Sequence, residues 1–150
     1  MHHISEFAHN QIMFCALLAW FIAQVLKIPT CLITEKRLDW KRILGSGGMP
    51  SSHTSFVVSL TIMVGAVQGF GSALFAVSFT LAAIVMYDAT GVRRETGTQA
   101  QVINEILRNV FIDGKPISED NLKELVGHKP VEVAAGFILG VIVALCFILL

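Results

Sequence analysis

The stretch VEVAAGFILGVIVALCFILL, residues 131–150, has a single charged side chain, that of Glu132. A helix rises about 1.5 Å per residue, so about 20 apolar residues cross a hydrocarbon core of about 30 Å, and this stretch predicts a membrane-spanning helix. Three other apolar segments, residues 11–33, 51–68 and 72–88, predict three more. Because 54% of the 150 residues are hydrophobic and only 15% are charged, we expect an all-α fold. It would be a single domain over residues 1–150, an integral membrane helical bundle of about four transmembrane helices.

The segments between the predicted spans differ in charge. Four spans place residues 34–50 and 88–130 on one side of the membrane, and both chain ends with residues 68–72 on the other. All eleven Lys and Arg residues fall on or border the first side. Since cytoplasmic loops carry an excess of cations, we expect the first side to face the cytoplasm.

Apolar residues recur with a helical period between Thr98 and Phe111, at positions 100, 103, 107 and 110. This spacing predicts an amphipathic helix at the cytoplasmic face, lying on the membrane. After it we expect a turn at residues 113–116 and a short helix from Ser118 to Gly127.

Two patterns inside the spans concern helix shape and packing. Pro29 predicts a kink or an end in the first span, because proline removes a backbone donor. Gly136 and Gly140 have the GxxxG spacing that favours close helix packing in membranes.

Composition argues against some functions. The net charge is +0, so the overall balance of charge indicates no nucleic-acid or polyanion partner. The three cysteines are scattered and form no CxxC pair, which is typical of small apolar filling residues rather than of a disulfide framework or a metal site.

Polar residues that can carry chemistry gather near the cytoplasmic face. Gly47-Gly48-Met49-Pro50-Ser51-Ser52-His53 joins a cationic loop to an apolar helix and offers backbone N–H groups, hydroxyls and an imidazole. A helix that starts there, with Gly48, Ser51 and Ser52 at its N-terminus, suits a phosphate group. Arg93 and Arg94 offer guanidinium groups that neutralise phosphoryl oxygens in a forked geometry.

A second imidazole comes from the far end of the chain. His128 and Glu132 are four residues apart at the start of the last span, so their side chains are expected on one face. A carboxylate there can orient the imidazole and leave its other nitrogen free to attack. Two histidines with a carboxylate and cations indicate phosphoryl transfer, in which His128 attacks phosphorus and His53 protonates the leaving oxygen.

These segments resemble a known family. Pro50-Ser51-Ser52-His53 resembles the PSGH motif of the type 2 phosphatidic acid phosphatase superfamily, to which the vanadium haloperoxidases also belong. The segment 127–136 is similar to its last motif. The stretches GGMPSSHTS, MYDATGVRRETGTQA and GHKPVEVAAG together resemble the small divergent branch found in bacteria and plastids. The resemblance implies a metal-independent lipid phosphatase of a bacterial cytoplasmic membrane, with a phosphohistidine intermediate and no cofactor.

Carried over by position, the resemblance makes His128 the nucleophile, Glu132 its orienting acid, His53 the general acid and Ser51 a phosphate ligand. Ser52 stands where the motif has glycine, and Glu132 stands where it usually has aspartate. The superfamily's first motif, a lysine followed by Arg-Pro, is not present as such, and Leu122 stands where its later arginine is expected.

The cationic roles therefore fall to Arg93, Arg94 and Lys27. Asp88 is a further candidate, although it could instead pair with the arginines. Asn104, on the predicted amphipathic helix, is another.

The predicted orientation favours a lipid made at the cytoplasmic leaflet, and we rank phosphatidylglycerol phosphate first. Phosphatidic acid and prenyl diphosphates are alternative substrates. Other hypotheses are a metal hydrolase using both site histidines with Glu132 and Asp88, and a non-catalytic lipid-binding scaffold. The expected partners are a phospholipid substrate and the bilayer, without nucleic acid. Because four spans leave little protein to enclose a site, homodimerisation is one remedy.

Overall fold

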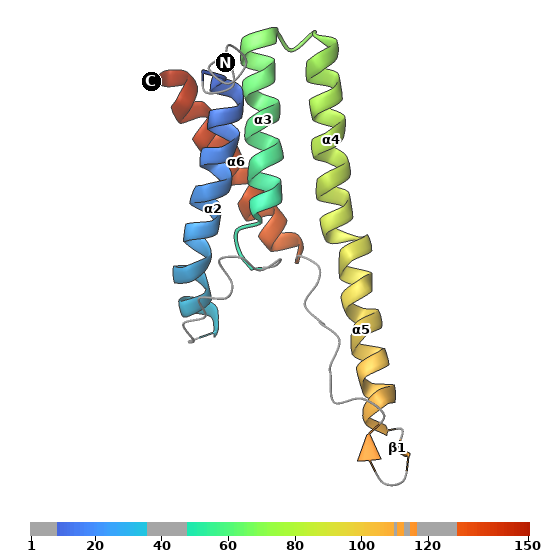
Figure 1. Ribbon diagram of the computed structural model, residues 1–150. Helices are drawn as coiled ribbons and strands as arrows, with labels where there is room; N and C mark the ends of the chain where they lie inside the picture. Colours follow the sequence, from blue (N-terminus) through green and yellow to red (C-terminus); the bar gives the residue numbers. More distant parts are fainter. Residues whose placement is uncertain (1–8, 36–47, 110, 113–114, 117–128) are drawn as a thin grey trace, which may run out of the picture.

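The computed structural model describes residues 9–35, 48–109, 111–112, 115–116 and 129–150, and within them it is almost wholly helical. Four apolar helices form a bundle (Figure 1): α2 (Gln11–Glu35), α3 (Ser52–Gln68), α4 (Ala73–Thr90) and α6 (Pro130–Leu149). The polar helix α5 (Val92–Asn109) follows α4, and two very short strands, β1 (Phe111–Ile112) and β2 (Lys115–Pro116), pair antiparallel. The predicted all-α class is confirmed.

The four apolar helices correspond to the four predicted spans, with ends that differ by one or two residues. Within the described residues, three segments are long and apolar enough to cross a membrane: Gln11–Ile33, Ala73–Ile106, which runs from α4 into α5, and Pro130–Leu149. Helix α3 is also apolar, but it has only 17 residues. At about 1.5 Å per residue it is about 25 Å long, slightly less than the hydrocarbon core.

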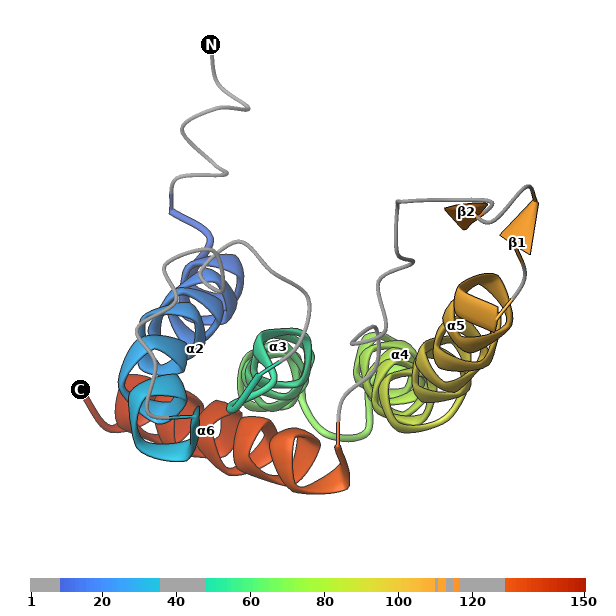
Figure 2. The same cartoon turned by 90° about the horizontal axis from the view of Figure 1, so that it is seen from below.

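Helix α3 is the centre of the bundle. It packs against α2, α4 and α6, and Figure 2 shows it between α2 and α4 with α6 crossing beneath. Most of its side chains are buried, whereas α4 buries only Ser78, Ala82 and Ala89. The apolar side chains that α4 exposes, such as Phe79 and Ile84, suit a surrounding of lipid tails.

The two glycines of the GxxxG pattern bring α6 against α3. A Cβ atom on Gly136 would overlap the carbonyl oxygen of Ser51, and one on Gly140 would lie 2.8 Å from the carbonyl oxygen of Ser55. The Ser55 hydroxyl donates a hydrogen bond of 3.0 Å to the Gly136 carbonyl oxygen. The pattern therefore serves packing inside the chain, between the first turns of α3 and the first half of α6.

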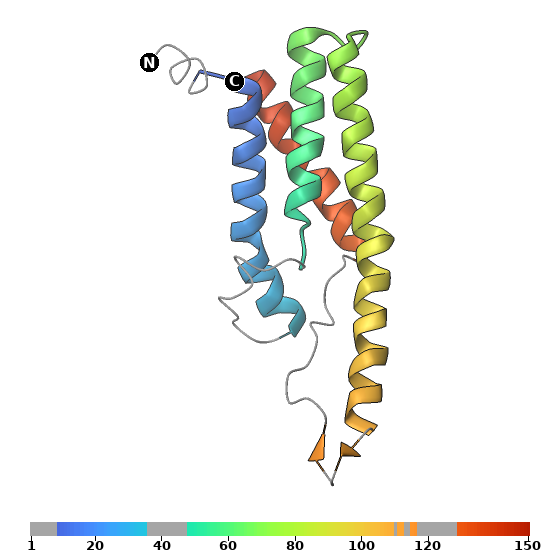
Figure 3. The same cartoon turned by 45° about the vertical axis from the view of Figure 1, so that its right-hand side comes forward.

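Pro29 kinks α2 but does not end it. The helix continues to Glu35, and Figure 3 shows its last turns changing direction. The Thr30 hydroxyl lies within hydrogen-bonding distance of the Leu26 carbonyl oxygen, at 2.8 Å, and of the Met49 carbonyl oxygen. The end of α2 is thereby held against the segment that leads into α3.

Helix α5 differs from its prediction in start and direction. It begins at Val92 rather than near Thr98 and continues α4 away from the bundle, instead of turning across its end (Figures 1 and 3). Only Gly91 separates the two helices, and backbone bonds pass through it: its N–H donates to the Tyr87 carbonyl oxygen and its carbonyl accepts from the Glu95 N–H. Helical backbone hydrogen bonds therefore continue past the sharp change in polarity after Asp88, although α4 itself ends at Thr90 with Gly91 as its C-cap.

The amphipathic character of α5 is confirmed, and its apolar side chains divide between buried and exposed positions. Gly97, Ala100 and Asn104 are buried, whereas Ile103 and Ile106 are exposed. The pairing of β1 with β2 agrees with the turn expected at residues 113–116. The short helix expected from Ser118 to Gly127 lies outside the described residues.

Candidate functional site

Ser51 begins helix α3 and is fully buried. As the N-cap residue it accepts hydrogen bonds at its Oγ from the Thr54 N–H, at 3.4 Å, and from the Thr54 hydroxyl, at 3.0 Å. Its own hydroxyl proton remains a donor for an anion. An N-cap serine satisfies one of the helix's first N–H groups, which explains why the helix starts here.

The start of α3 is joined to the start of α6. The Ser51 N–H donates a hydrogen bond of 2.9 Å to the Glu132 carbonyl oxygen, so two segments 81 residues apart meet at their backbones. The N–H groups of Ser51 and Thr54 are therefore already used. A phosphate bound at this helix start would depend more on hydroxyls and on a cation than on these two backbone donors.

Lys27 supplies such a cation from α2. Its side chain is only 2% exposed, and its Nζ donates a hydrogen bond of 3.4 Å to the Oγ of Ser52, which is itself 1% exposed. Burying a charge costs free energy, so a buried charged side chain is usually paired or has a functional role. The structure thus brings Lys27 to the same helix turn as Ser51 and Ser52.

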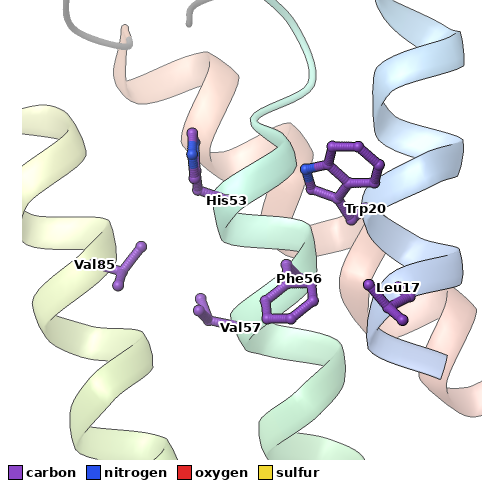
Figure 4. A pocket seen from close by; sticks show the side chains of 6 residues that line it. All are labelled: Leu17, Trp20, His53, Phe56, Val57 and Val85. Atoms are coloured by element: carbon purple, nitrogen blue, oxygen red, sulfur yellow. The ribbon is translucent and has the colours of Figure 1, made fainter. Parts of the chain in front are cut away.

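His53 projects from this turn beside an open hollow of about 350 Å³. Figure 4 shows its imidazole at the end of the hollow nearest the start of α3, with Trp20 and Leu17 on α2 and Val85 on α4 around it. Phe56 and Val57 complete the lining. The site therefore combines a polar helix start with an apolar hollow, and His53 lies where the two meet.

Glu132 is the third residue of α6. Its Oε2 accepts a hydrogen bond of 3.1 Å from the Lys129 N–H, and Lys129 is the N-cap residue. A carboxylate has further acceptor positions, so this bond does not use up its capacity to orient an imidazole. His128 lies outside the described residues. Since α6 begins at Pro130, the shared helix face expected for His128 and Glu132 remains a prediction.

A family model described as the divergent PAP2 family matches residues 8–143. The chain belongs to this family. It is also similar to the uncharacterized membrane protein YuiD of Bacillus subtilis (strain 168), with 40% identity over 150 residues that cover 93% of this chain and 95% of YuiD. No solved structure matches the chain significantly. The family suggested by the three sequence segments is confirmed, and the chain is an integral membrane protein.

Of the other candidate residues of this divergent PAP2 protein, Gly48, Asp88, Arg93 and Arg94 lie toward the same end of the bundle as the start of α3, whereas Asn104 lies farther along α5, which leads away from the bundle (Figure 1). Gly48 has a φ of +89°, a conformation that favours glycine, and is partly exposed. Arg93 and Arg94 are in the first turn of α5, and their side chains lie outside the described part of the chain. Asp88 is partly exposed in the last turn of α4. Asn104, 1% exposed, lies on the buried stripe of α5, beyond the junction with α4.

Metal-ligating side chains do not gather in the part of this divergent PAP2 protein that the structure describes. There, no group of three or more His, Cys, Asp or Glu residues could hold a metal ion. The metal-hydrolase hypothesis needs His128, which lies outside those residues.

Gln24 of this divergent PAP2 protein was not among the candidates that the sequence predicted. Gln24 lies in α2, three residues before Lys27, and is 9% exposed. Its Oε1 accepts no hydrogen bond from any residue that the structure describes. The position of a glutamine inside a predicted span was the signal that could have found it, because polar groups at membrane depth are costly unless paired.

Proposed function

We propose that this divergent PAP2 protein is a membrane lipid phosphatase that hydrolyses a phosphomonoester at the cytoplasmic face through a phosphohistidine intermediate. The observation that carries the proposal is the start of α3, where buried Ser51, Ser52 and Lys27 meet and His53 borders an apolar hollow. A cation and hydroxyls suit the phosphate, and the apolar lining suits a lipid rather than a water-soluble phosphate ester.

The first half of the reaction transfers the phosphoryl group to the protein. A ring nitrogen of His128 forms a bond to phosphorus while the bond from phosphorus to the lipid oxygen breaks, and His53 gives its proton to that oxygen. Glu132 holds the His128 ring in the required tautomer. Lys27, Arg93, Arg94 and the Ser51–Ser52 hydroxyls stabilise the negative charge on the other phosphoryl oxygens, with Gly48 allowing a close approach.

The second half returns the protein to its starting state. Water attacks phosphorus and breaks its bond to His128, while His53, now deprotonated, accepts a proton from that water. Inorganic phosphate leaves. The two half-reactions together consume one water molecule per lipid, and they need neither a metal ion nor another cofactor.

Phosphatidylglycerol phosphate is the first-ranked substrate, because the cationic side of the chain, which carries the site, is proposed to face the leaflet where this lipid is made. Phosphatidic acid and prenyl diphosphates are the alternatives. The surrounding bilayer delivers the lipid, and a second copy of the chain would enclose the site further.

The test is phosphate release by the purified protein in detergent, with each of the three lipids supplied in turn. Wild-type protein should release phosphate, and His128→Ala should abolish release because no other group replaces the nucleophile. His9→Ala, at an exposed residue before α2, is the matched control and should retain activity.

Two results would contradict the proposal. Unchanged activity in His128→Ala would exclude the phosphohistidine route. Lipid binding without phosphate release by the wild type would favour the non-catalytic scaffold.

Full activity in a chelator combined with inhibition by vanadate would argue against a metal hydrolase.

A further inference from the structure

Gln24 presents a buried hydrogen-bond acceptor to which no residue in the described part of the chain donates. The side chain is 9% exposed, and among the described residues nothing donates to its Oε1. Buried polar atoms in proteins are almost always hydrogen-bonded, so each exception requires an explanation such as a functional role. Inside a membrane bundle the requirement is stricter, because bulk water is not at hand.

The position of Gln24 follows from its neighbours on α2. Trp20, Gln24 and Lys27 have the spacing i, i+4, i+7 and therefore lie along one face of the helix. Trp20 lines the hollow that holds His53 (Figure 4), and Lys27 donates to Ser52. Since α2 and α3 run antiparallel side by side (Figure 1), Gln24 lies on the α3-facing side, between the hollow and the contact of Lys27 with Ser52.

We propose that the Gln24 carbonyl accepts a hydrogen bond from a hydroxyl group of the substrate, on the carbon next to the one that carries the phosphate. The inference rests on the proposed function, because the phosphate must be held at Lys27 and Ser52. The atoms between phosphorus and the apolar part of the lipid would then run from this contact toward the hollow, which is lined by Trp20, one turn along α2 from Gln24. A hydroxyl satisfies a lone acceptor, whereas an ester oxygen cannot, because it has no proton to donate.

This chemistry separates the three candidate substrates. The terminal glycerol of phosphatidylglycerol phosphate carries a free hydroxyl next to its phosphorylated carbon. Phosphatidic acid carries an acyl ester at the corresponding carbon, and a prenyl diphosphate carries only hydrocarbon there. Gln24 would therefore make the protein selective for a phosphomonoester with a neighbouring free hydroxyl.

The test compares phosphatidylglycerol phosphate with an analogue in which 1,3-propanediol replaces the terminal glycerol, so that only the hydroxyl on the middle carbon is missing. With equal acyl chains in mixed micelles, wild-type kcat/KM should be about 5- to 150-fold higher for the hydroxyl-bearing lipid, the range expected when a buried acceptor is left unsatisfied. In Gln24→Met, which keeps the side-chain length and removes the acceptor, the ratio should fall close to one.

The ratio is measured on one preparation, so a misfolded fraction lowers both rates equally and cancels. Gln11→Met, the same change at the exposed first residue of α2, is the matched control and should keep the wild-type ratio.

An unchanged ratio in Gln24→Met would overturn the inference. An equal loss of activity on both lipids leaves the ratio unchanged, so it overturns the inference in the same way. A wild-type ratio near one rejects the inference alone. A wild type that hydrolyses neither lipid overturns the inference, and phosphate release from phosphatidic acid or a prenyl diphosphate then decides separately whether the proposed function stands.

Discussion

At the scale of single residues, the polar groups around the start of α3 are already occupied by one another. Ser51 caps its own helix, Ser52 accepts from Lys27, and Glu132 bonds to the backbone of Lys129. An incoming phosphate would therefore meet side chains that are held in place before it arrives. Such preorganisation is the main source of electrostatic catalysis in enclosed sites.

Substitution of Lys27 is expected to lower activity without lowering thermal stability. In Lys27→Met the buried ammonium group is lost, and kcat/KM should fall by about 10- to 150-fold, since hydrogen bonds to charged groups contribute about 1.5–3 kcal/mol. Thermal unfolding in detergent should change little, because the desolvation cost of the buried charge offsets the interactions that are lost with it. Phosphate-release kinetics and a melting curve on the same preparation check both parts.

Lys27→Arg is the control for charge and should recover part of the activity. A melting temperature that falls together with activity would instead indicate that Lys27 mainly supports the fold.

Sequence motifs predict site residues with recognisable chemistry, but they do not predict residues whose importance depends on where they lie in the fold. His53, Ser51 and Glu132 stand in motifs, so their candidacy needed no coordinates. Gln24 stands in no motif, and it is of interest because it is buried with no donor among the residues that the structure describes, which only the packing of α2 reveals. The contact of Lys27 with Ser52 likewise joins two helices that sequence spacing cannot relate.

At the scale of helices, the approach of α6 to α3 depends on Gly136. In Gly136→Ala the added methyl group would overlap the Ser51 carbonyl oxygen, so the two helix starts must move apart. We expect a loss of about 1–3 kcal/mol in stability, as for other overpacked sites, and a marked loss of phosphatase activity because Ser51 is displaced. Thermal unfolding and phosphate release measure the two effects.

Gly71→Ala is the matched control, because a Cβ atom there has nothing within 4 Å. Equal behaviour of the two variants would show that the contact of α6 with α3 tolerates a methyl group.

Helix positions were predictable from hydrophobicity, whereas helix ends were less so. The apolar runs placed α2, α3, α4 and α6 to within one or two residues. The predicted start of α5, near Thr98, was wrong because a fall in hydrophobicity marks where a chain leaves the apolar layer, not where backbone hydrogen bonds stop. At Gly91 those bonds continue.

At the scale of the whole molecule, the orientation in the membrane rests on the distribution of Lys and Arg. It predicts that the turn between α3 and α4 lies outside the cell and the start of α6 lies inside. In intact bacterial cells, a membrane-impermeant thiol reagent should label Gly71→Cys. Lys129→Cys should react only after the membrane is opened, since both residues are exposed on the protein itself.

Both variants should carry Cys146→Ala, because Cys146 is exposed whereas Cys15 and Cys31 are buried. The reverse labelling pattern would place the site on the outer face and favour a prenyl diphosphate over phosphatidylglycerol phosphate.

In the proposed phosphatase, the hydrogen bond from the Ser51 N–H to the Glu132 carbonyl oxygen would affect the speed of each turnover. It holds the beginnings of two helices that are distant in sequence as one rigid piece, so their mutual alignment is settled once, when the chain folds. The entropy of bringing them together is then not lost again each time a lipid binds. Substrate binding energy is left for holding the lipid itself.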